Sequence, residues 1–244
     1  MPTPQLDAEQ SLDDAVATIG WFLLGSSQRL AEQYRHNGHW RLLVDWLDCL
    51  VELRALLSSL GQAAPRASTS ELRQVLDALL EDWRPRVQAG QQDDTARQEA
   101  PAQFAAELEQ TRWGLFSLNT SRWLLARTWT SARNKRGDRQ GAAALQSWLP
   151  TFFAEEGRDL QLKRYQQQPE DLAEQLPRLE RLLLWLHLAR GTLDIAETDR
   201  LFGELNKLAE LAKRPLSPEE LEARMTQAQI IMSLKPWKTL LKNG

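Results

Sequence analysis

The stretch STSELRQVLDALLEDW (68–83) decides the fold class of this chain. Its apolar residues recur every three or four positions, which is the spacing of one face of an α-helix. Ser68 and Glu71 stand three apart ahead of that face, which is the pattern of a capping box, and Pro85 is expected to close the helix. The apolar face comprises Leu72, Val75, Leu76, Leu79, Leu80 and Trp83.

The same helical period continues along most of the chain. Ser217 and Glu220 form a second capping box with Pro218 at the first helical position, and Pro169 opens another helix that Gly191 ends. No stretch alternates with period two, and β-branched residues are scarce, so the sequence predicts an all-α protein. The predicted helices lie near residues 6–35, 39–60, 69–88, 98–134, 141–167, 170–190, 194–213 and 217–233.

Short breaks between helices favour antiparallel neighbours, and helical bundles are the natural packing. The most polar stretch, QAGQQDDTARQEAPAQ (88–103), is the expected hinge between two lobes. The leucine-dense segments 50–61 and 179–191 both end in glycine, and this echo is compatible with a duplicated bundle. The expected lobes cover about 6–95 plus part of the following helix, and 104–214, with a C-terminal helix at 217–233.

Composition narrows the class of protein further. Of 244 residues 42% are hydrophobic and 26% charged, the balance of a globular protein with a sizeable core. Trp46, Trp83 and Trp185 sit on leucine-rich faces and are predicted to be core residues. No apolar run could span a membrane, and the acidic N-terminus has no signal pattern. A single cysteine, Cys49, excludes an internal disulfide and favours a cytoplasmic location.

Charge is distributed unevenly along the chain, although the net charge is only −3. Residues 1–110 carry 9 basic and 17 acidic side chains, whereas residues 111–190 carry 13 basic and 8 acidic. The middle segment can therefore attract a polyanion locally. The balance falls short of the strongly basic composition expected of a dedicated nucleic-acid binder, so no specific nucleic acid is expected.

No motif predicts an active site. Glu32, His36 and His39 could approach one another only if a helix continued through Asn37-Gly38, which more simply ends it, so no metal is expected. No glycine-rich phosphate loop follows a strand, and the paired acids Glu155-Glu156 are typical of helix-start charges. We expect neither catalysis nor a cofactor.

The most basic stretch is LNTSRWLLARTWTSARNKRGDR (118–139), which is predicted to form one helix. Arg122, Trp129, Arg133 and Arg136 fall at offsets of 0, 7, 11 and 14, close to one helical face. Guanidinium groups grip phosphate oxygens with two hydrogen bonds each, so such a row would suit an extended polyanion. Alternatively, these cations simply complement the dipole at the end of a helix. The spacing alone leaves both interpretations open.

Four segments, in this order and spacing, resemble the CHAD domain, the conserved histidine α-helical domain of bacterial inorganic triphosphatases. They are PRASTSELRQVLDALL (65–80), SRWLLARTW (121–129), LKRYQQQP (162–169) and EQLPRLERLLLWL (174–186), and the resemblance covers roughly residues 15–215. It implies two antiparallel four-helix bundles related by duplication. It also implies binding of inorganic polyphosphate along a basic surface between the bundles.

The name-giving histidines of the CHAD domain are largely replaced. Val44 takes the place of the first, and only Arg54 survives clearly among the basic residues of that signature helix. Pro177 stands where a second histidine is usual, followed by the matching basic residue Arg178, and His187 lies on the same segment. Arg127 and Lys163 match basic positions of the triphosphatase relatives.

The catalytic CYTH module that precedes CHAD domains in triphosphatases has a Glu-x-Glu-x-Lys strand, which this sequence lacks. The expected function is therefore a non-catalytic module that binds polyphosphate or another phosphate-rich polyanion, and that accompanies a CYTH domain as an accessory. The alternative is a structural or protein-interaction module without an anion site. The residues predicted to bind the polyanion are Arg54, Arg122, Arg127, Lys163 and Arg178.

Overall fold

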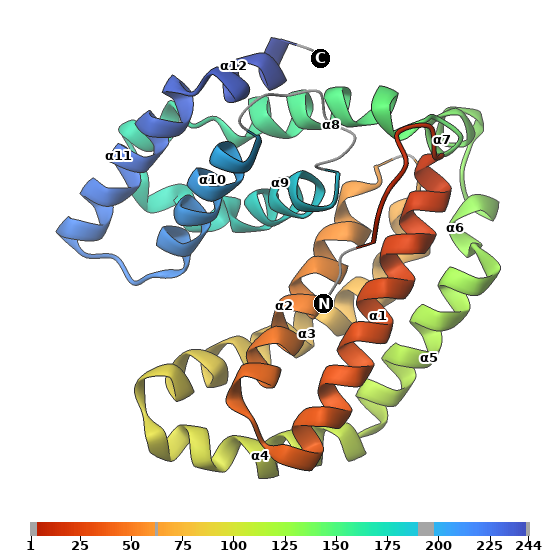
Figure 1. Ribbon diagram of the computed structural model, residues 1–244, viewed down its shortest axis with the longest axis vertical. Helices are drawn as coiled ribbons and strands as arrows, with labels where there is room; N and C mark the ends of the chain where they lie inside the picture. Colours follow the sequence, from red (N-terminus) through yellow and green to blue (C-terminus); the bar gives the residue numbers. More distant parts are fainter. Residues whose placement is uncertain (1–3, 62, 190–197, 243–244) are drawn as a thin grey trace. The chain divides into compact units, whose positions relative to one another are not determined.

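A computed structural model describes residues 4–61, 63–189 and 198–242, and these contain helices and no strand. The chain divides into two compact units (Figure 1). The N-terminal unit is residues 13–142, and the C-terminal unit combines residues 143–244 with residues 1–12. All-α architecture is thus confirmed.

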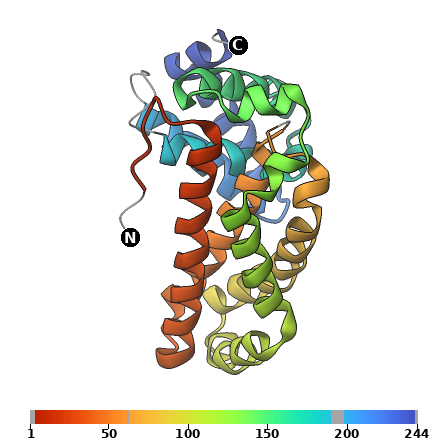
Figure 2. The same cartoon turned by 90° about the vertical axis from the view of Figure 1, so that its right-hand side faces the viewer.

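The N-terminal unit is built from seven helices of the described chain. They are α1 (Leu12–Asn37), α2 (Trp40–Ser59), α3 (Arg66–Gln92), α4 (Asp94–Glu109), α5 (Thr111–Ala126), α6 (Thr128–Ser131) and α7 (Lys135–Gly141). Helix α3 packs against α2, α4 and α5, and α1 runs beside α5 (Figure 2). The two helices meet at Gly20, where a Cβ atom would lie 2.4 Å from Leu124 Cδ2.

An aromatic cluster forms the core of the N-terminal unit. Trp46 of α2 makes edge-to-face contacts with Trp83 of α3 and Phe104 of α4, with ring centroids 5.8 and 4.9 Å apart. All three side chains are fully buried. Since each ring comes from a different helix, edge-to-face packing here joins α2, α3 and α4 into one core. The prediction that Trp46 and Trp83 are core residues is confirmed.

Helix α3 contains the stretch that decided the fold class. All of its predicted apolar face is buried except Val75, which is half-buried. The predicted ends were wrong. Helix α3 begins at Arg66, before Ser68, so the Ser68 hydroxyl donates to Pro65 O instead of capping. The helix also continues through Pro85 to Gln92, because Pro85 is exposed on the outer face and forfeits only one backbone hydrogen bond there.

The polar stretch 88–103, expected as a hinge, covers the end of α3 and much of α4 within the N-terminal unit. Asp93 caps α4 by accepting a hydrogen bond from Thr95 N at 2.8 Å. Arg97 Nε donates to Gly90 O at 2.9 Å, which ties α4 back to α3. The polar composition therefore belongs to the solvent-facing side of a helical pair, and the two units divide after residues 12 and 142.

The C-terminal unit has five α-helices and two 3₁₀ helices among its described residues. They are α8 (Leu145–Leu160), η1 (Arg164–Gln166), η2 (Pro169–Gln175), α9 (Leu176–Leu188), α10 (Thr198–Lys213), α11 (Pro218–Ser233) and α12 (Lys235–Lys242). Helix α9 packs against α8 and α10, α10 against α11, and α12 against α8. Trp148 and Trp185, 4.8 Å apart, lie at the centre with Phe152. Trp185 is fully buried, as predicted.

The helix signals read from this part of the sequence had mixed outcomes. Ser217 caps α11 as predicted, because its hydroxyl accepts a hydrogen bond from Glu220 N at 3.2 Å, but the Glu220 carboxylate pairs with Arg214 and does not complete the capping box. Pro169 opens the 3₁₀ helix η2, and α9 follows it directly. Gly191, predicted to end this helix, lies outside the described residues. The predicted helix 141–167 ends earlier, at Leu160, and α12 was not predicted at all.

Candidate functional site

The basic stretch 118–139 is not one helix. Helix α5 ends at Ala126, and Arg127 adopts a left-handed conformation with φ 46° and ψ 44°. The chain then forms the short helices α6 and α7. Residues on either side of this break do not share a helical face, so the predicted alignment of Arg122, Trp129, Arg133 and Arg136 was wrong.

Trp129 and Arg133 are part of the core. The fully buried Trp129 donates from Nε1 to Asp13 Oδ1 at 3.0 Å. The Arg133 guanidinium grips the same carboxylate with two hydrogen bonds of 2.8 and 2.7 Å, and it also donates to Asp138 and to Ala63 O. These bonds, those to Asp13 above all, raise the pKa of Arg133 above its usual value. Arg133 therefore joins α1 to α7, and because its guanidinium is engaged in these hydrogen bonds it is not available to a ligand.

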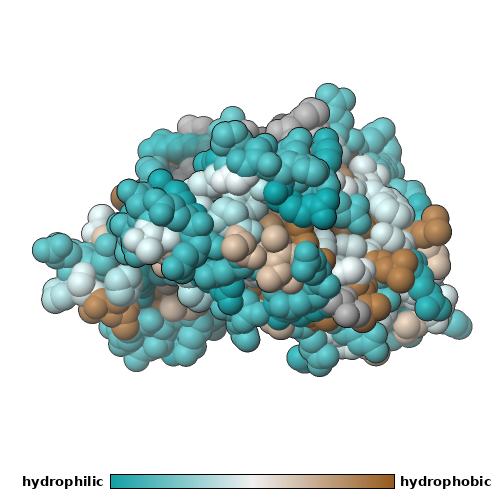
Figure 3. Space-filling model, turned by 90° about the horizontal axis from the view of Figure 1, so that it is seen from below, coloured by the Kyte–Doolittle hydropathy of each residue, from teal (hydrophilic) through white to brown (hydrophobic). Residues whose placement is uncertain are grey.

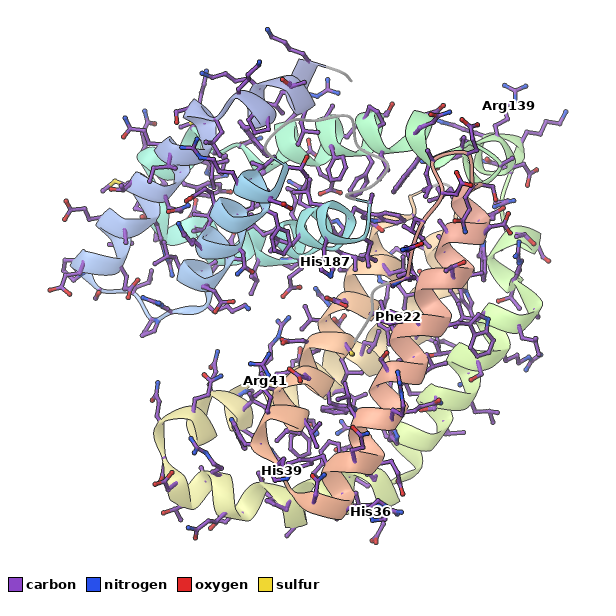
Figure 4. The ribbon with its side chains drawn as sticks, viewed as in Figure 1. Phe22, His36, His39, Arg41, Arg139 and His187 are labelled. Atoms are coloured by element: carbon purple, nitrogen blue, oxygen red, sulfur yellow. The ribbon has the colours of Figure 1, made fainter. Side chains whose placement is uncertain are left out.

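The remaining cations of the stretch face solvent. Arg127 is 45% exposed and pairs with Asp14 at 2.7 Å. Lys135, Arg136 and Arg139 are exposed on α7, and Figure 4 shows the Arg139 side chain projecting away from that helix. Lys135 and Arg139 are one helical turn apart and so lie on the same side of α7. Within the described chain, none of these three residues forms an ion pair. We call Lys135, Arg136 and Arg139 the α7 cations.

Arg122 lines a small polar pocket of about 270 Å³ between α3 and α5. Ser68, Asn119 and Thr128 contribute hydroxyl and amide groups to this pocket, and Glu71 contributes a carboxylate. The guanidinium has no ion-pair partner in the part of the chain that the structure describes. Arg122 is therefore the one predicted site residue of the N-terminal unit whose charge is not offset by a described ion pair.

Arg54 of α2 is engaged with a neighbouring helix. Its guanidinium forms an ion pair with Asp77 of α3, and the side chain is only 23% exposed. The two residues line a pocket of about 390 Å³ together with Glu81 and Arg84. Because two acids balance the two cations lining it, this pocket is a poor attractor for an anion.

Lys163 and Arg178 belong to the C-terminal unit and differ in their surroundings. Arg178 of α9 donates to Glu156 Oε2 at 3.1 Å and to Asp159 O at 2.6 Å, so it joins α9 to α8. Arg181 shares the same Glu156 carboxylate. Lys163 is exposed before η1 and forms no ion pair among the described residues.

The five predicted residues are thus divided between the units: Arg54, Arg122 and Arg127 lie in one, and Lys163 and Arg178 in the other. Sequence reasoning missed Lys135 and Arg139 as the most available cations. The signal was present as two basic residues four apart, Lys135 and Arg139, in a stretch whose only acid is Asp138.

No group of three or more potential metal ligands occurs among the described residues. His36 Nε2 donates a hydrogen bond to the Glu32 carboxylate at 2.9 Å at the end of α1, and Gly38, with φ 65°, turns the chain before His39 (Figure 4). Burial, followed by the nearby Glu52 and Asp48 carboxylates, raises the pKa of the Cys49 thiol to about 12. The thiol is therefore protonated at neutral pH and is a poor nucleophile.

The fold and the site define this protein as an all-α chain of two helical units with exposed cations on α7. None of its described helices has the length and apolar character needed to cross a membrane. No family model matches the sequence, and no curated protein matches it either.

Proposed function

We propose that this chain is a non-catalytic helical module that binds a phosphate-rich polyanion, and that inorganic polyphosphate is the ligand. The observation that carries the proposal is the set of α7 cations, which are exposed and without ion-pair partners in the described chain. Arg122 and Arg127 precede them in the same basic stretch, residues 118–139, whose only acid is Asp138. The CHAD resemblance supplies the identity of the polyanion.

The same resemblance supports a finer proposal for the fold. We infer that the two units are the two four-helix bundles of a CHAD-like domain, related by duplication. The leucine-dense segments that echo each other lie one in each unit: the first covers the second half of α2 and the two residues after it, and the second begins within α9. Each unit also has a tryptophan-centred core. The CHAD resemblance alone supports two further parts of the proposal, which are a cytoplasmic location in a bacterium and a CYTH domain as a partner.

Polyphosphate titration tests the proposed function. Fluorescence anisotropy with end-labelled long-chain polyphosphate should give saturable binding at low salt, and affinity should fall steeply as salt rises, because each neutralised phosphate releases counterions. Tripolyphosphate incubated with Mg²⁺ should not be hydrolysed, since no carboxylate cage for a catalytic metal occurs among the described residues. Absence of binding at low salt would refute the proposal.

A second candidate function is a protein-interaction module without an anion site. It is favoured by the ion pairs of Arg54, Arg127 and Arg178, which offset the charge of three of the five predicted cations with carboxylates of the same chain. Helix α5 also exposes Leu118 and Leu125, which are two turns apart. The face in Figure 3 is mostly hydrophilic, with hydrophobic side chains only in small patches. Binding of polyphosphate would decide between the two functions.

A further inference from the structure

The C-terminal unit contains a pocket of about 570 Å³ between the end of α8 and α12. Its apolar lining includes Leu162, Met232, Trp237 and Leu241. Leu162 and Trp237 are almost completely buried, whereas Leu241 is half-buried at the pocket's edge. A volume of this size is in the range of small-molecule sites, which bury most of a ligand against apolar side chains.

Two local features of the backbone shape this pocket. Gly157 allows α12 to approach α8 closely, since a Cβ atom there would lie 2.9 Å from Leu241 Cδ2 and 3.1 Å from Trp237 Cη2. Gln161 then adopts a left-handed conformation, with φ 48°, that ends α8 and turns the chain. As a result Leu162 is buried, while the next residue, Lys163, stays exposed.

Cations alone supply the charge of this pocket. Among the described residues that line it, the charged side chains are Arg158, Lys163, Arg164 and Lys238, and no carboxylate lines it. Arg164 is held at the edge by Gln168 and by Asp171, at 3.0 and 2.5 Å. Lys163 and Lys238 have no ion-pair partner in the described chain. An apolar lining with a cationic edge complements a molecule that has an apolar body and an anionic end.

We propose that this pocket binds a small amphipathic anion, which consists of an acyl chain or an aromatic ring that carries one carboxylate or phosphate. The apolar body lies against Leu162, Trp237 and Leu241, and the anionic end is held by Lys163 and Lys238. Polyphosphate does not fit this description, because it has no apolar part to desolvate the lining. The site is therefore separate from the α7 cations, and its occupancy does not depend on polyphosphate binding.

Dodecanoate, used below its micellar concentration, is the probe for this proposal. The chain has three methionines, so ¹³C-methyl-methionine NMR gives few signals, and Met232→Leu identifies the one in the pocket. Dodecanoate should shift the Met232 signal with saturation and leave Met225 unchanged. Dodecanol, which has the same chain without a charge, should bind at least about tenfold more weakly, the effect of one charge-assisted contact.

Two pairs of matched variants complete the test. Lys163→Gln with Lys238→Gln should weaken dodecanoate binding by about tenfold or more, whereas Lys207→Gln with Lys213→Gln changes the net charge equally and should have no effect. Leu241→Glu should abolish binding, and Leu216→Glu, at an exposed leucine of this unit outside the pocket, should not. The proposal is overturned if the Met232 signal does not move, if dodecanol binds as tightly as dodecanoate, or if the two lysine pairs behave alike.

Discussion

Replacing Asp13 by asparagine tests the interpretation of the basic stretch in the most quantitative way. Asp13 receives hydrogen bonds from Trp129 Nε1 and from both terminal nitrogens of Arg133, and the side chains of Asp13 and Arg133 are only 13% and 8% exposed. Asparagine has nearly the same shape but carries no charge and only one oxygen. It would leave a largely buried guanidinium with only the exposed Asp138 carboxylate to balance its charge.

The expected cost follows from the geometry. Removing one partner of a buried ion pair typically costs about 3–5 kcal/mol. Because the asparagine oxygen still accepts one hydrogen bond and Asp138 still contacts Arg133, we expect Asp13→Asn to lower the free energy of unfolding by about 2–4 kcal/mol. Asp138→Asn is the matched control. Its side chain is 60% exposed, so it should cost below about 1 kcal/mol.

Urea titration followed by far-UV circular dichroism measures both changes. A double-mutant cycle with Arg133→Met should give a coupling energy of more than about 1.5 kcal/mol for Asp13 and Arg133, because Asp13→Asn costs much less once the guanidinium is gone. If Asp13→Asn and Asp138→Asn lower the free energy of unfolding equally, or if the cycle shows no coupling, then Asp13 does not hold the Arg133 guanidinium in the folded protein. Arg133 would then be available to bind a ligand.

Two further predictions concern other positions of the fold. Gly114→Ala should stabilise the protein by about 0.4–1 kcal/mol, because the added methyl lies on α5 with no atom within 4 Å and Ala has the higher helix propensity. Gly141→Ala should destabilise the protein by about 1–3 kcal/mol, because the added methyl would lie 2.1 Å from Arg133 Nη1. Equal melting temperatures for Gly114→Ala and Gly141→Ala would contradict this packing. Arg224 is 1% exposed and donates hydrogen bonds to the carbonyls of Leu211, Pro169 and Arg214, so Arg224→Met should lower the free energy of unfolding by about 2–4 kcal/mol in urea titrations. Arg224→Lys should not restore this stability, because an ammonium group cannot reach all three carbonyls. A Lys variant as stable as the unaltered protein would show that these hydrogen bonds are dispensable.

The helical faces could be predicted from the sequence because the pattern that defines them is local. A buried face such as that of α3 repeats every three or four residues, and this repeat can be read within 16 residues. The end of α5 could not be predicted in the same way. Arg127 is neither glycine nor proline, and its left-handed conformation costs about 1–2 kcal/mol. Contacts made on folding offset that cost, among them the ion pair with Asp14, which is distant in sequence, and the tilted packing of Trp123 against Trp129 across the break, with ring centroids 4.3 Å apart.

The candidate site was less predictable than the fold for a related reason. Whether an arginine is available to a ligand depends on where its nearest carboxylate lies in space. The partners of Arg54, Arg178 and Arg133 are 23, 22 and 120 residues away in the sequence. Helical spacing contains no information about them. The surroundings of the α7 cations are easier to predict, because α7 is a short exposed helix and the residues near each cation in space are also near it in the sequence.

The salt dependence of polyphosphate binding by two charge variants tests the central claim most directly. The first is Lys135→Gln, Arg136→Gln and Arg139→Gln together, and the matched control is Arg35→Gln, Arg41→Gln and Arg86→Gln, which removes the same charge from exposed sites on α1, α2 and α3. Each engaged cation contributes about 0.7 to the slope of log Kd against log salt concentration, as it does for a single-stranded polyanion. The α7 variant should therefore bind more weakly at low salt and show a slope smaller by about 2, while the control keeps the slope of the unaltered protein. Equal slopes for the two variants would contradict the assignment of polyanion binding to the α7 cations.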